Sequence, residues 1–579
     1  MTAAHDRLLS ELRQFVEDER EAGAARLLTI WERPLEDKLR DGWSQRFARV
    51  ERGPEPDTLL AYPGEGESRF REGDLLQLHA GRPAPDGAGR HLALEAELDA
   101  AWLLRGRGAG AVLLAAADGP FYADVDAIDV SDAYEESLAE IARSEIGREI
   151  VLPLLAGTLE PEFDPAQARV GRDVAQARGF NRRQVEAVEL AAGARHLACI
   201  QGPPGTGKSA VLALAARLMC ERRDRVLVTS HTHMAINNAL NRIALEGVPL
   251  AKIGLSSQCR GLDAGVPRFE RIADWDQRPA RGGYVVGATP FATCSPRLQG
   301  CEFDTVLFDE ASQVTVPLAL MAMRKGRRFV FVGDQQQLPP VVLSRSVLDA
   351  QAMSAFAALT SRQAFHTVML DETYRMNRWL AEWPSRTHYG GALRAAGPNR
   401  DRRLALAGVP EAFAAVFAAE HDGVFIAARD PVARTRSARD AELVGRLCAA
   451  AVSGGLAPAD IGVVTPFRAQ GRAIRAQLAR TLGAQARAIV ADTVERMQGQ
   501  ERELIVLSLA SADASFLAAI ADFFFQPQRL NVAATRAKTR LIVIGPPVPR
   551  VDATASPHVR RGIEAYAGLL AGLHRIELP

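Results

Sequence analysis

The sequence predicts an α/β protein with two tandem parallel-sheet units, preceded by a small β-rich domain and helices. Short β-branched runs alternate with helical segments twice after about residue 180, as in βαβ units. Ahead of them, short apolar stretches are separated by Gly, Pro and Asp clusters, which is typical of a small β domain. The chain has 579 residues, enough for three to four domains of about 150 residues each. It has no internal period of about 20 to 50 residues, so a solenoid is not expected.

The front of the chain divides into helical and β-rich stretches. Apolar residues at helical spacing predict a helical lead-in over residues 8–40. Residues 42–130 show the texture of short strands, including apolar stretches at 59–62, 75–78, 111–114 and 121–130. A second helical stretch is expected over 134–155, followed by a polar connector that ends near Gly179.

Two sets of strands follow the connector. The first set is predicted at residues 197–200, 226–229, 284–287, 305–308 and 329–332. The second set is predicted at residues 424–426, 461–464, 488–490, 504–509 and 541–544. We expect the seam between the two α/β units within residues 345–365.

The formal net charge of +0 is a cancellation between two segments. Residues 1–165 hold 18 Lys and Arg against 34 Asp and Glu, a balance of −16, which leaves +16 for residues 166–579. Such asymmetry indicates nucleic-acid contact, or simply a solvated acidic domain beside a basic one. If nucleic acid is the partner, positive charge should gather along one groove over the two α/β units.

Cysteine usage and hydropathy bear on the compartment. The six cysteines form no CxxC pair, so a zinc ribbon or an iron–sulfur cluster is not indicated, and free thiols in a reducing compartment are expected. The N-terminal stretch is too charged for a signal peptide, and no uninterrupted apolar run approaches about 18 residues. We therefore expect a cytoplasmic protein without membrane contact.

Residues 202–209, GPPGTGKS, form a full GxxxxGK[ST] phosphate-binding loop between an apolar strand and an apolar helix. Backbone N–H groups would surround phosphate oxygens, Lys208 would reach the terminal phosphates, and Ser209 would ligate Mg²⁺. The chain has only five lysines, which argues against an accidental Gly-rich turn. The expected nucleotide-binding residues of the loop are Gly202, Gly205, Thr206, Gly207, Lys208 and Ser209.

Two adjacent acids end a buried strand about a hundred residues downstream. Asp309 would hold Mg²⁺ and Glu310 would act as general base, although an isolated Asp-Glu pair is usually a solvated turn. Phosphoryl transfer also needs positive charge at the γ-phosphate, for which Arg375 and Arg536 are candidates. On charge alone neither stands out among 65 arginines.

The order of the motifs decides among nucleotide-hydrolysing enzymes. The chain resembles superfamily 1B helicases, specifically the group containing the nonsense-mediated-decay helicase and the immunoglobulin mu-binding helicase. The matching segments are residues 181–184, 202–209, 287–289, 309–313, 333–340, 374–376, 464–467, 498–501 and 531–538.

The resemblance implies a role for each matched residue. Gln184 would read the adenine edge, Tyr374 would stack on the adenine, and Glu501 would hold the ribose. Gln337 would sense the γ-phosphate and position water, with Arg375 and Arg536 as paired arginine fingers. Single-stranded nucleic acid would cross both units, with contacts from Ser230, Thr289, Thr465 and Thr493, although hydroxyls at strand ends are more often ordinary caps.

The resemblance also implies an architecture of two RecA-like P-loop domains preceded by a small β-barrel on a helical stalk. The expected boundaries are a stalk helix at 1–41, a barrel at 42–132, a second stalk helix and connector at 133–165, and RecA-like domains at 166–350 and 351–579. Residues 70–78 are similar to a barrel strand that follows a Gly-Asp turn in the family.

Four features depart from the family pattern. His231 replaces a common Asn, which puts the first nucleic-acid contact in doubt, and the segment 493–497 lacks the usual aromatic residue. The insertion between the P-loop and Asp309 is small or lost, and we place it within residues 251–282. The cysteine count excludes the zinc domain of the decay helicase.

The leading hypothesis is therefore a monomeric ATP- and Mg²⁺-dependent helicase or translocase that moves 5′ to 3′ on single-stranded DNA or RNA. The alternative is an ATP-gated clamp or remodelling ATPase that binds nucleic acid or a protein without unwinding. A small-molecule NTPase is disfavoured by Gln337, Tyr374 and Arg536. No motif distinguishes DNA from RNA.

Overall fold

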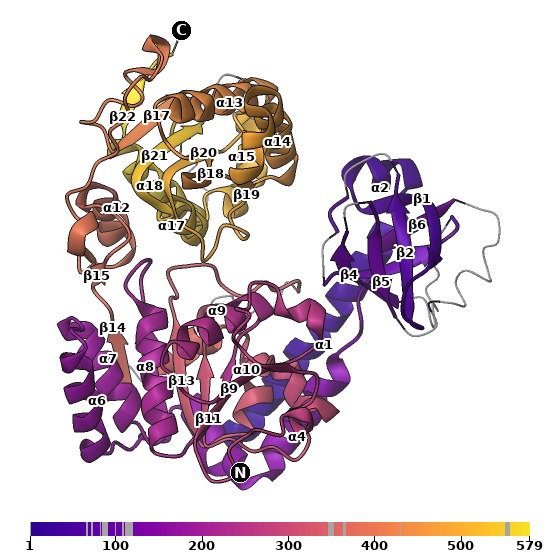
Figure 1. Ribbon diagram of the computed structural model, residues 1–579, viewed down its shortest axis with the longest axis vertical. Helices are drawn as coiled ribbons and strands as arrows, with labels where there is room; N and C mark the ends of the chain where they lie inside the picture. Colours follow the sequence, from indigo (N-terminus) through magenta and orange to yellow (C-terminus); the bar gives the residue numbers. More distant parts are fainter. Residues whose placement is uncertain are drawn as a thin grey trace.

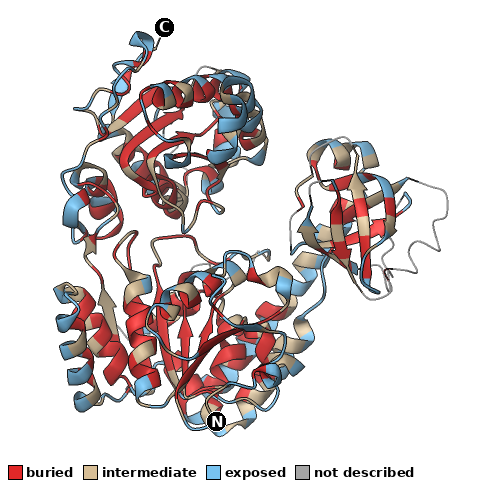
Figure 2. Ribbon diagram, viewed as in Figure 1, coloured by how far each residue is buried: buried red, intermediate tan, exposed pale blue. Residues whose placement is uncertain are grey.

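The computed structural model contains a closed β-barrel and two α/β domains, each built on a sheet whose strands run parallel (Figure 1). It describes residues 2–64, 68–70, 73–81, 83, 91–98, 100–106, 109, 120–344, 353–362, 366–428, 430–550 and 556–578. The strands of both sheets and of the barrel are mostly buried, and exposed residues gather on the outer helices and loops (Figure 2). The predicted fold class, two parallel-sheet domains preceded by a barrel on helices, is confirmed.

The helical lead-in is α1 (Ala3–Trp31) followed by α2 (Leu35–Asp41). Thr2 caps α1 by accepting a hydrogen bond from the backbone N–H of His5 at 3.4 Å. The second helical stretch comprises α4 (Ser131–Arg143), a π-helical turn (Gly147–Val151) and α5 (Leu152–Ala156). Both predicted helical regions are thus confirmed.

The barrel contains six antiparallel strands in the order β1-β2-β5-β4-β3-β6. Their bounds are β1 (Ser44–Arg52), β2 (Thr58–Pro63), β3 (Leu75–His79), β4 (His91–Glu97), β5 (Trp102–Arg105) and β6 (Phe121–Val125). Its interior is apolar, with Trp102 packed edge-to-face on Phe47 at a centroid distance of 5.4 Å. The barrel strand expected over 70–78 is β3; Arg71 and Glu72, and the apolar stretch at 111–114, lie outside the described residues.

A buried ion pair ties the stalk to the barrel. Lys38 of α2 is 2% exposed and pairs with Asp124 of β6, which is fully buried and also lies 3.3 Å from His79 Nε2. Trp31, at the end of α1, donates its indole N–H to the carbonyl oxygen of Val125 at 2.8 Å. The barrel is therefore held at the end of α1, to one side of the α/β domains (Figure 1).

The first α/β domain is built on an eight-stranded sheet in the order β10-β9-β11-β8-β12-β13-β7-β14. Its strands are β7 (Leu197–Gln201), β8 (Arg225–Thr229), β9 (Leu250–Ile253), β10 (Arg268–Phe269), β11 (Tyr284–Gly287), β12 (Thr305–Phe308), β13 (Arg328–Gly333) and β14 (Thr367–Met369). Its helices are α6 (Pro165–Ala177), α7 (Arg182–Gly193), α8 (Lys208–Glu221), α9 (His233–Ala244), α10 (Val316–Met323) and α11 (Ala355–Arg362).

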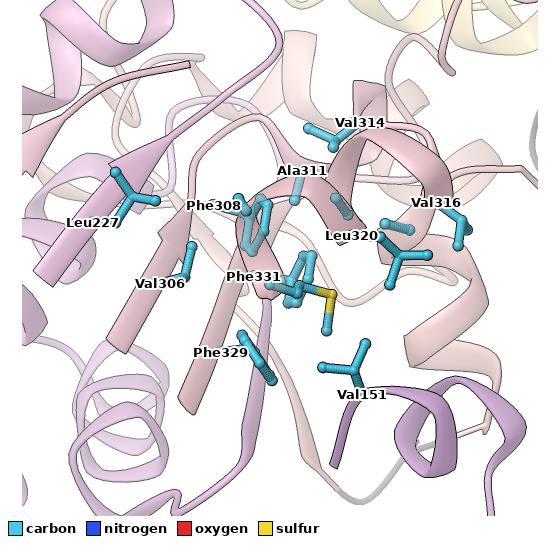
Figure 3. Packing of buried hydrophobic residues seen from close by; sticks show 14 of the residues in the cluster. Val151, Leu227, Val306, Phe308, Ala311, Val314, Val316, Leu320, Phe329 and Phe331 are labelled. Atoms are coloured by element: carbon cyan, nitrogen blue, oxygen red, sulfur yellow. The ribbon is translucent and has the colours of Figure 1, made fainter. Parts of the chain in front are cut away.

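Alternate residues of its strands face two different helical layers. Val330 and Val332 of β13 pack with α7, α8 and α9. Phe329 and Phe331 point the other way, into a core shared with α10 and the stalk, to which Val151 of the stalk also belongs (Figure 3). The stalk thus covers part of one face of the first sheet.

Three predictions for this domain need correction. The segment before Gly179 is not a connector, because Asp164 caps helix α6, whose buried contacts are small residues such as Ala168 and Gly171 that give weak apolar periodicity. The segment 251–282 is not only an insertion, because β9 and β10 lie within the sheet. Strand β14 lies beyond the predicted boundary at 350 yet pairs with β7, so the first sheet takes its edge strand from later in the chain.

The second α/β domain is built on a six-stranded sheet in the order β19-β18-β20-β21-β17-β22. Its strands are β17 (Gly423–Ala427), β18 (Ile461–Thr465), β19 (Val490–Thr493), β20 (Arg502–Ser508), β21 (Ala537–Gly545) and β22 (His574–Ile576). The strand predicted at 488–490 is β19, which begins where the prediction ended. A two-stranded sheet of β15 (Glu372–Thr373) and β16 (Arg394–Ala395) precedes it.

The helices of this second half are α12 (Arg378–His388), α13 (Ala438–Ser453), α14 (Arg468–Leu482), α15 (Ala514–Ala519), α16 (Ala521–Phe524), α17 (Pro527–Ala534) and α18 (Pro557–Ala571). All six cysteines are free thiols. Across the described ranges, every helix is too short or too polar to traverse a lipid bilayer.

Candidate active site

The phosphate-binding loop lies between β7 and α8, in the strand–loop–helix setting that the sequence predicts. Gly207, with φ of +87°, ends the loop at the start of α8, and Gly205 has φ of +74°. Both angles fall in the left-handed region that glycine adopts without steric cost. Lys208 Nζ donates to the carbonyl oxygen of Gly202 at 2.6 Å, so its ammonium lies over the loop, and Ser209 is exposed beside it.

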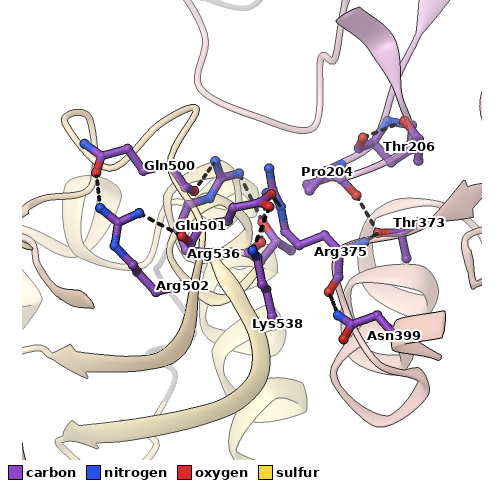
Figure 4. A network of polar contacts seen from close by, with 12 residues as sticks. Pro204, Thr206, Thr373, Arg375, Asn399, Gln500, Glu501, Arg502, Arg536 and Lys538 are labelled. Atoms are coloured by element: carbon purple, nitrogen blue, oxygen red, sulfur yellow. Dashed lines mark hydrogen bonds and ion pairs between the residues drawn. The ribbon is translucent and has the colours of Figure 1, made fainter. Parts of the chain in front are cut away.

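The loop is bonded to the segment that leads to the second domain. Tyr374 N donates to Gly205 O at 2.9 Å, and Thr373 Oγ1 donates to Pro204 O at 2.8 Å (Figure 4). A Cβ atom on Gly205 would lie 2.4 Å from Arg375 Cβ and 2.7 Å from Thr373 Oγ1. Glycine is therefore needed here both for the backbone angle and for the close approach.

Gln184 and Tyr374, the two predicted adenine contacts, lie at one end of the loop. Gln184 is buried, accepts a hydrogen bond from Asn181 N at 3.2 Å and donates to Thr206 O at 3.0 Å. Tyr374 is 40% exposed, and its hydroxyl accepts from Asn181 Nδ2 at 2.9 Å and donates to Glu372 at 3.0 Å. An exposed ring beside a buried amide is the arrangement that stacking on a base and reading its edge require.

The two acids lie at the carboxyl end of β12. Asp309 is 7% exposed, and burial together with the neighbouring charge of Glu310 raises its pKa to about 7, while Lys208 opposes the shift. Glu310 has a φ of +49°, an uncommon angle for a residue with a side chain. Gln498 of the second domain donates its amide N–H to Glu310 Oε2 at 3.2 Å. Glu310, the general-base candidate, is therefore contacted by a residue of the second domain. Gln498 belongs to the matched segment 498–501, but the resemblance assigns it no role.

The donor set fits a Mg²⁺ ion. Asp309 and the Ser209 hydroxyl provide the hard oxygen ligands that Mg²⁺ takes in nucleotide sites. The raised pKa of Asp309 arises from burial next to Glu310, and a divalent cation would offset this repulsion.

Gln337 lies in a buried polar network that joins the two domains. Its amide donates to Asp334 Oδ2 at 2.9 Å, and Asp334 also accepts from the Tyr389 hydroxyl at 2.7 Å. Asn531 of α17 donates to Tyr389 at 2.9 Å and to Gln336 O at 2.8 Å. Burial raises the pKa of Asp334. Tyr389 could not be identified from the sequence, because no matched segment contains it.

The two arginine-finger candidates differ in their surroundings. Arg375 donates to Glu501 at 2.6 Å and to Thr535 O at 3.0 Å, and Lys538 pairs with Glu501 at 3.1 Å (Figure 4). Burial raises the pKa of Glu501, but these two cations outweigh it and hold the pKa below its usual value. Glu501, the predicted ribose contact, therefore forms an ion pair with Arg375, one of the two arginine-finger candidates.

Arg536 is 1% exposed and bonds only to oxygens without formal charge among the described residues, namely Val532 O at 2.9 Å, Gln500 O at 3.4 Å and Thr535 Oγ1 at 3.4 Å. Burial and the charge of Arg375 lower its pKa to about 9. A buried arginine without a carboxylate is a costly arrangement that an anion would stabilise. This favours Arg536 as the group that meets the γ-phosphate.

The four predicted nucleic-acid contacts lie at strand ends but are largely covered. Ser230 and Thr465 are fully buried and Thr493 is 6% exposed, whereas Thr289 is half-buried. Thr465 and Thr493 are register partners on β18 and β19. The four residues lie at strand ends, as predicted, but three of the four side chains are buried and do not form the surface there. Burial also lowers the pKa of His231, which lies 3.4 Å from Ser230 Oγ.

Two protein-family models match the chain, and each is described as an AAA domain. One matches residues 179–271 and 281–345, and the other matches residues 351–547. The two matches together contain every residue considered above for nucleotide binding and hydrolysis.

Curated relatives include the DNA replication ATP-dependent helicase/nuclease DNA2 of two organisms. The Mus musculus protein is 29% identical over 405 residues, which cover 64% of this chain and 37% of that protein. The Saccharomyces cerevisiae protein is 25% identical over 448 residues, which cover 72% of this chain and 29% of that protein. The matched part of the chain thus spans between 29% and 37% of the length of these relatives.

Among solved structures, the crystal structure of arterivirus nonstructural protein 10 (helicase) is 14% identical, with a TM-score of 0.38. The match covers 88% of this chain and 80% of that chain. A TM-score of this size does not by itself define a common fold.

Proposed function

We propose that this chain, whose matched domains and relatives support a superfamily 1B helicase, uses ATP hydrolysis to move along or unwind nucleic acid. One observation carries the proposal: residues of both α/β domains meet at a single phosphate-binding loop. Gln498 contacts Glu310 across the domains, and Arg375, placed against Gly205, reaches Glu501 and Thr535 of the second domain. A nucleotide at this loop would touch both domains at once.

In this proposal the chain's own groups divide the work of ATP hydrolysis. Backbone N–H groups of the loop and Lys208 bind the phosphates, and Tyr374 and Gln184 hold the base. Glu310 removes the proton from the attacking water, positioned with help from Gln337, and the arginine fingers neutralise charge on the γ-phosphate. Mg²⁺, held by Ser209 and Asp309, would supply further neutralisation of phosphate charge.

Coupling to movement follows from where the cross-domain contacts lie. The bonds from Gln498 to Glu310 and from Asn531 to Gln336 change if the domains close or open around ATP. Binding and product release would therefore drive a hinge motion between the two sheets. That motion, acting on a bound strand, is the proposed basis of translocation.

Among the finer assignments, the direction of movement and the narrower family group rest on motif order. We propose movement from 5′ to 3′ on single-stranded DNA or RNA, a monomeric active form, a cytoplasmic location and a place near the nonsense-mediated-decay and immunoglobulin mu-binding helicases. The DNA2 relatives support the superfamily without distinguishing this narrower group.

The deciding experiment measures ATP turnover with and without single-stranded DNA and RNA. Stimulation by either polymer supports the proposal, and folded protein that neither polymer stimulates refutes it. A strand-displacement assay on a forked duplex then separates a helicase from an ATP-gated clamp, because a clamp hydrolyses ATP without displacing a strand. Glu310→Gln serves as the inactive control in both assays.

A further inference from the structure

A cluster of phenylalanines covers the carboxyl end of β18, where the predicted nucleic-acid contacts Thr465 and Thr493 are buried. Phe467 lies two residues beyond the end of β18, Phe516 lies on α15, and Phe523 lies on α16. The ring of Phe467 lies 6.3 Å from that of Phe516 and 6.0 Å from that of Phe523, centroid to centroid. We call these three residues the aromatic platform.

The platform is accessible although it is strongly apolar. Phe523 is 37% exposed, and Phe467 and Phe516 are half-buried, while the neighbouring Phe524 is buried beneath Phe467 at 6.3 Å. Phe523 thus presents an exposed ring beside two half-buried rings, which together form an apolar surface that a stacked base would cover.

Arginines surround the platform. Arg529 lies 4.1 Å above the Phe523 ring and pairs with Glu495, and Arg434 lies 5.9 Å from the Phe516 ring and pairs with Asp513. Helix α14, which begins directly after Phe467, adds two further arginines, Arg468 and Arg472. Arg468 is exposed and Arg472 half-buried, and neither has an ion pair with any described residue.

The loop between β2 and β3 of the barrel brings a further arginine, Arg69, near Arg468 and Arg472. Arg69 packs over the Trp43 ring at 4.0 Å and donates to Asp41 O at 2.8 Å. Burial and the charges of Arg468 and Arg472 lower its pKa to about 10, so the three guanidinium groups act on one another without a carboxylate from α14. A chain of phosphates between the barrel and α14 would relieve this repulsion.

We propose that the aromatic platform and the arginines of α14 form a binding site for single-stranded nucleic acid, with unpaired bases stacked on Phe516 and Phe523 and the phosphates on Arg468 and Arg472. Proteins that bind single-stranded nucleic acid without sequence preference use aromatic rings, on which the bases stack, and nearby cations, which bind the phosphates. This inference rests on the proposed function and assigns to the second domain the surface that the buried threonines do not provide.

The test compares how tightly the protein binds a single-stranded DNA oligonucleotide and an abasic DNA oligonucleotide of the same length. Binding of a single-stranded RNA oligonucleotide is measured in parallel. The abasic strand keeps the phosphates and lacks the rings. Wild-type protein should bind the base-containing strand roughly 5- to 150-fold more tightly, the range expected for one stacked base. Phe523→Leu should remove most of this preference, and Phe523→Tyr should retain it.

Two further variants separate the contributions. Phe163→Leu is the matched control, because Phe163 is 42% exposed on the first domain, away from the platform, and its replacement should leave the preference unchanged. Arg468→Gln should weaken both strands alike and lower the salt dependence of binding by about one phosphate contact. ATP turnover without nucleic acid should be the same in all four variants.

The outcomes distinguish this inference from the proposed function. If wild type binds both strands equally, or if Phe523→Leu keeps the full preference, the platform is not a stacking site and this inference fails. If wild type binds no single-stranded nucleic acid at all, the proposed function itself fails.

Discussion

Replacing Gly205 by alanine should separate the phosphate-binding loop from the segment that joins the two domains. The new Cβ atom would lie 2.4 Å from Arg375 Cβ and 2.7 Å from Thr373 Oγ1, both closer than side-chain atoms approach. A residue with a side chain also pays about 1–2 kcal/mol for the left-handed angle of +74°. Forcing atoms into a filled space typically costs a further ~1–3 kcal/mol. We therefore expect Gly205→Ala to lose about 2–5 kcal/mol of stability in this region, together with tight ATP binding.

Gly247→Ala is the matched control for backbone strain. Gly247 has a φ of +71°, nearly the same as Gly205, but no atom lies within 4 Å of the Cβ position. This variant should therefore lose only the ~1–2 kcal/mol of the left-handed angle. The loss of stability is measured by urea unfolding, from the first unfolding transition of the chain. The loss of ATP affinity is measured by titration with ATP. If Gly205→Ala is as stable as Gly247→Ala and binds ATP normally, the contact between the loop and the joining segment is not needed.

The other predictions concern catalysis and the stalk. Glu310→Gln should lower ATP turnover by ~10²- to 10⁴-fold without weakening ATP binding, and comparable loss of both would contradict its role as base. Arg536→Ala should slow turnover by ~10³- to 10⁵-fold, measured with ATP affinity, and near-normal turnover would exclude it as a finger. Lys38→Met leaves Asp124 buried without its cation and should cost ~3–5 kcal/mol by urea unfolding, whereas Asp124→Asn in the same background should recover part of the loss. Burial raises the pKa of Asp124, but hydrogen bonds from His79 and Lys38 outweigh it and lower the pKa, so this stabilisation is present above about pH 4 and is lost as the pH falls through the lowered value. Acid titration of unfolding that is unchanged in Lys38→Met would refute that linkage.

Much of the active site could be predicted because its chemistry depends on short, contiguous segments. The loop at 202–209 and the acids Asp309 and Glu310 each follow a buried strand, and parallel strands bring their carboxyl ends to one edge of a sheet. Residues that reach the site from elsewhere in the chain could not be predicted in this way. Tyr389 contacts Asp334 and Asn531 only because helix α12 places it there.

The predictions that failed share a different cause. Helix α6 buries Ala168, Gly171 and Ala175 against α7, and such small residues produce little contrast with polar neighbours. Strand β14 has only three residues, all half-buried, which is too short for a clear strand pattern, and its place in the first sheet is set by pairing with β7. The four hydroxyl residues were placed at the correct edge of the sheets, but the sequence could not show that three of them are covered.

The shared core of the stalk and the first sheet affects how the chain can be shortened. Leu9, Phe15 and Val151 pack in the same cluster as Phe329 and Phe331. A chain that began at the first α/β domain would leave the part of this face that the stalk covers open to water, and would be expected to aggregate. The helices that carry the barrel therefore also complete the fold of the domain that holds the phosphate-binding loop, so a shortened chain would have to keep these helices even if it lacked the barrel.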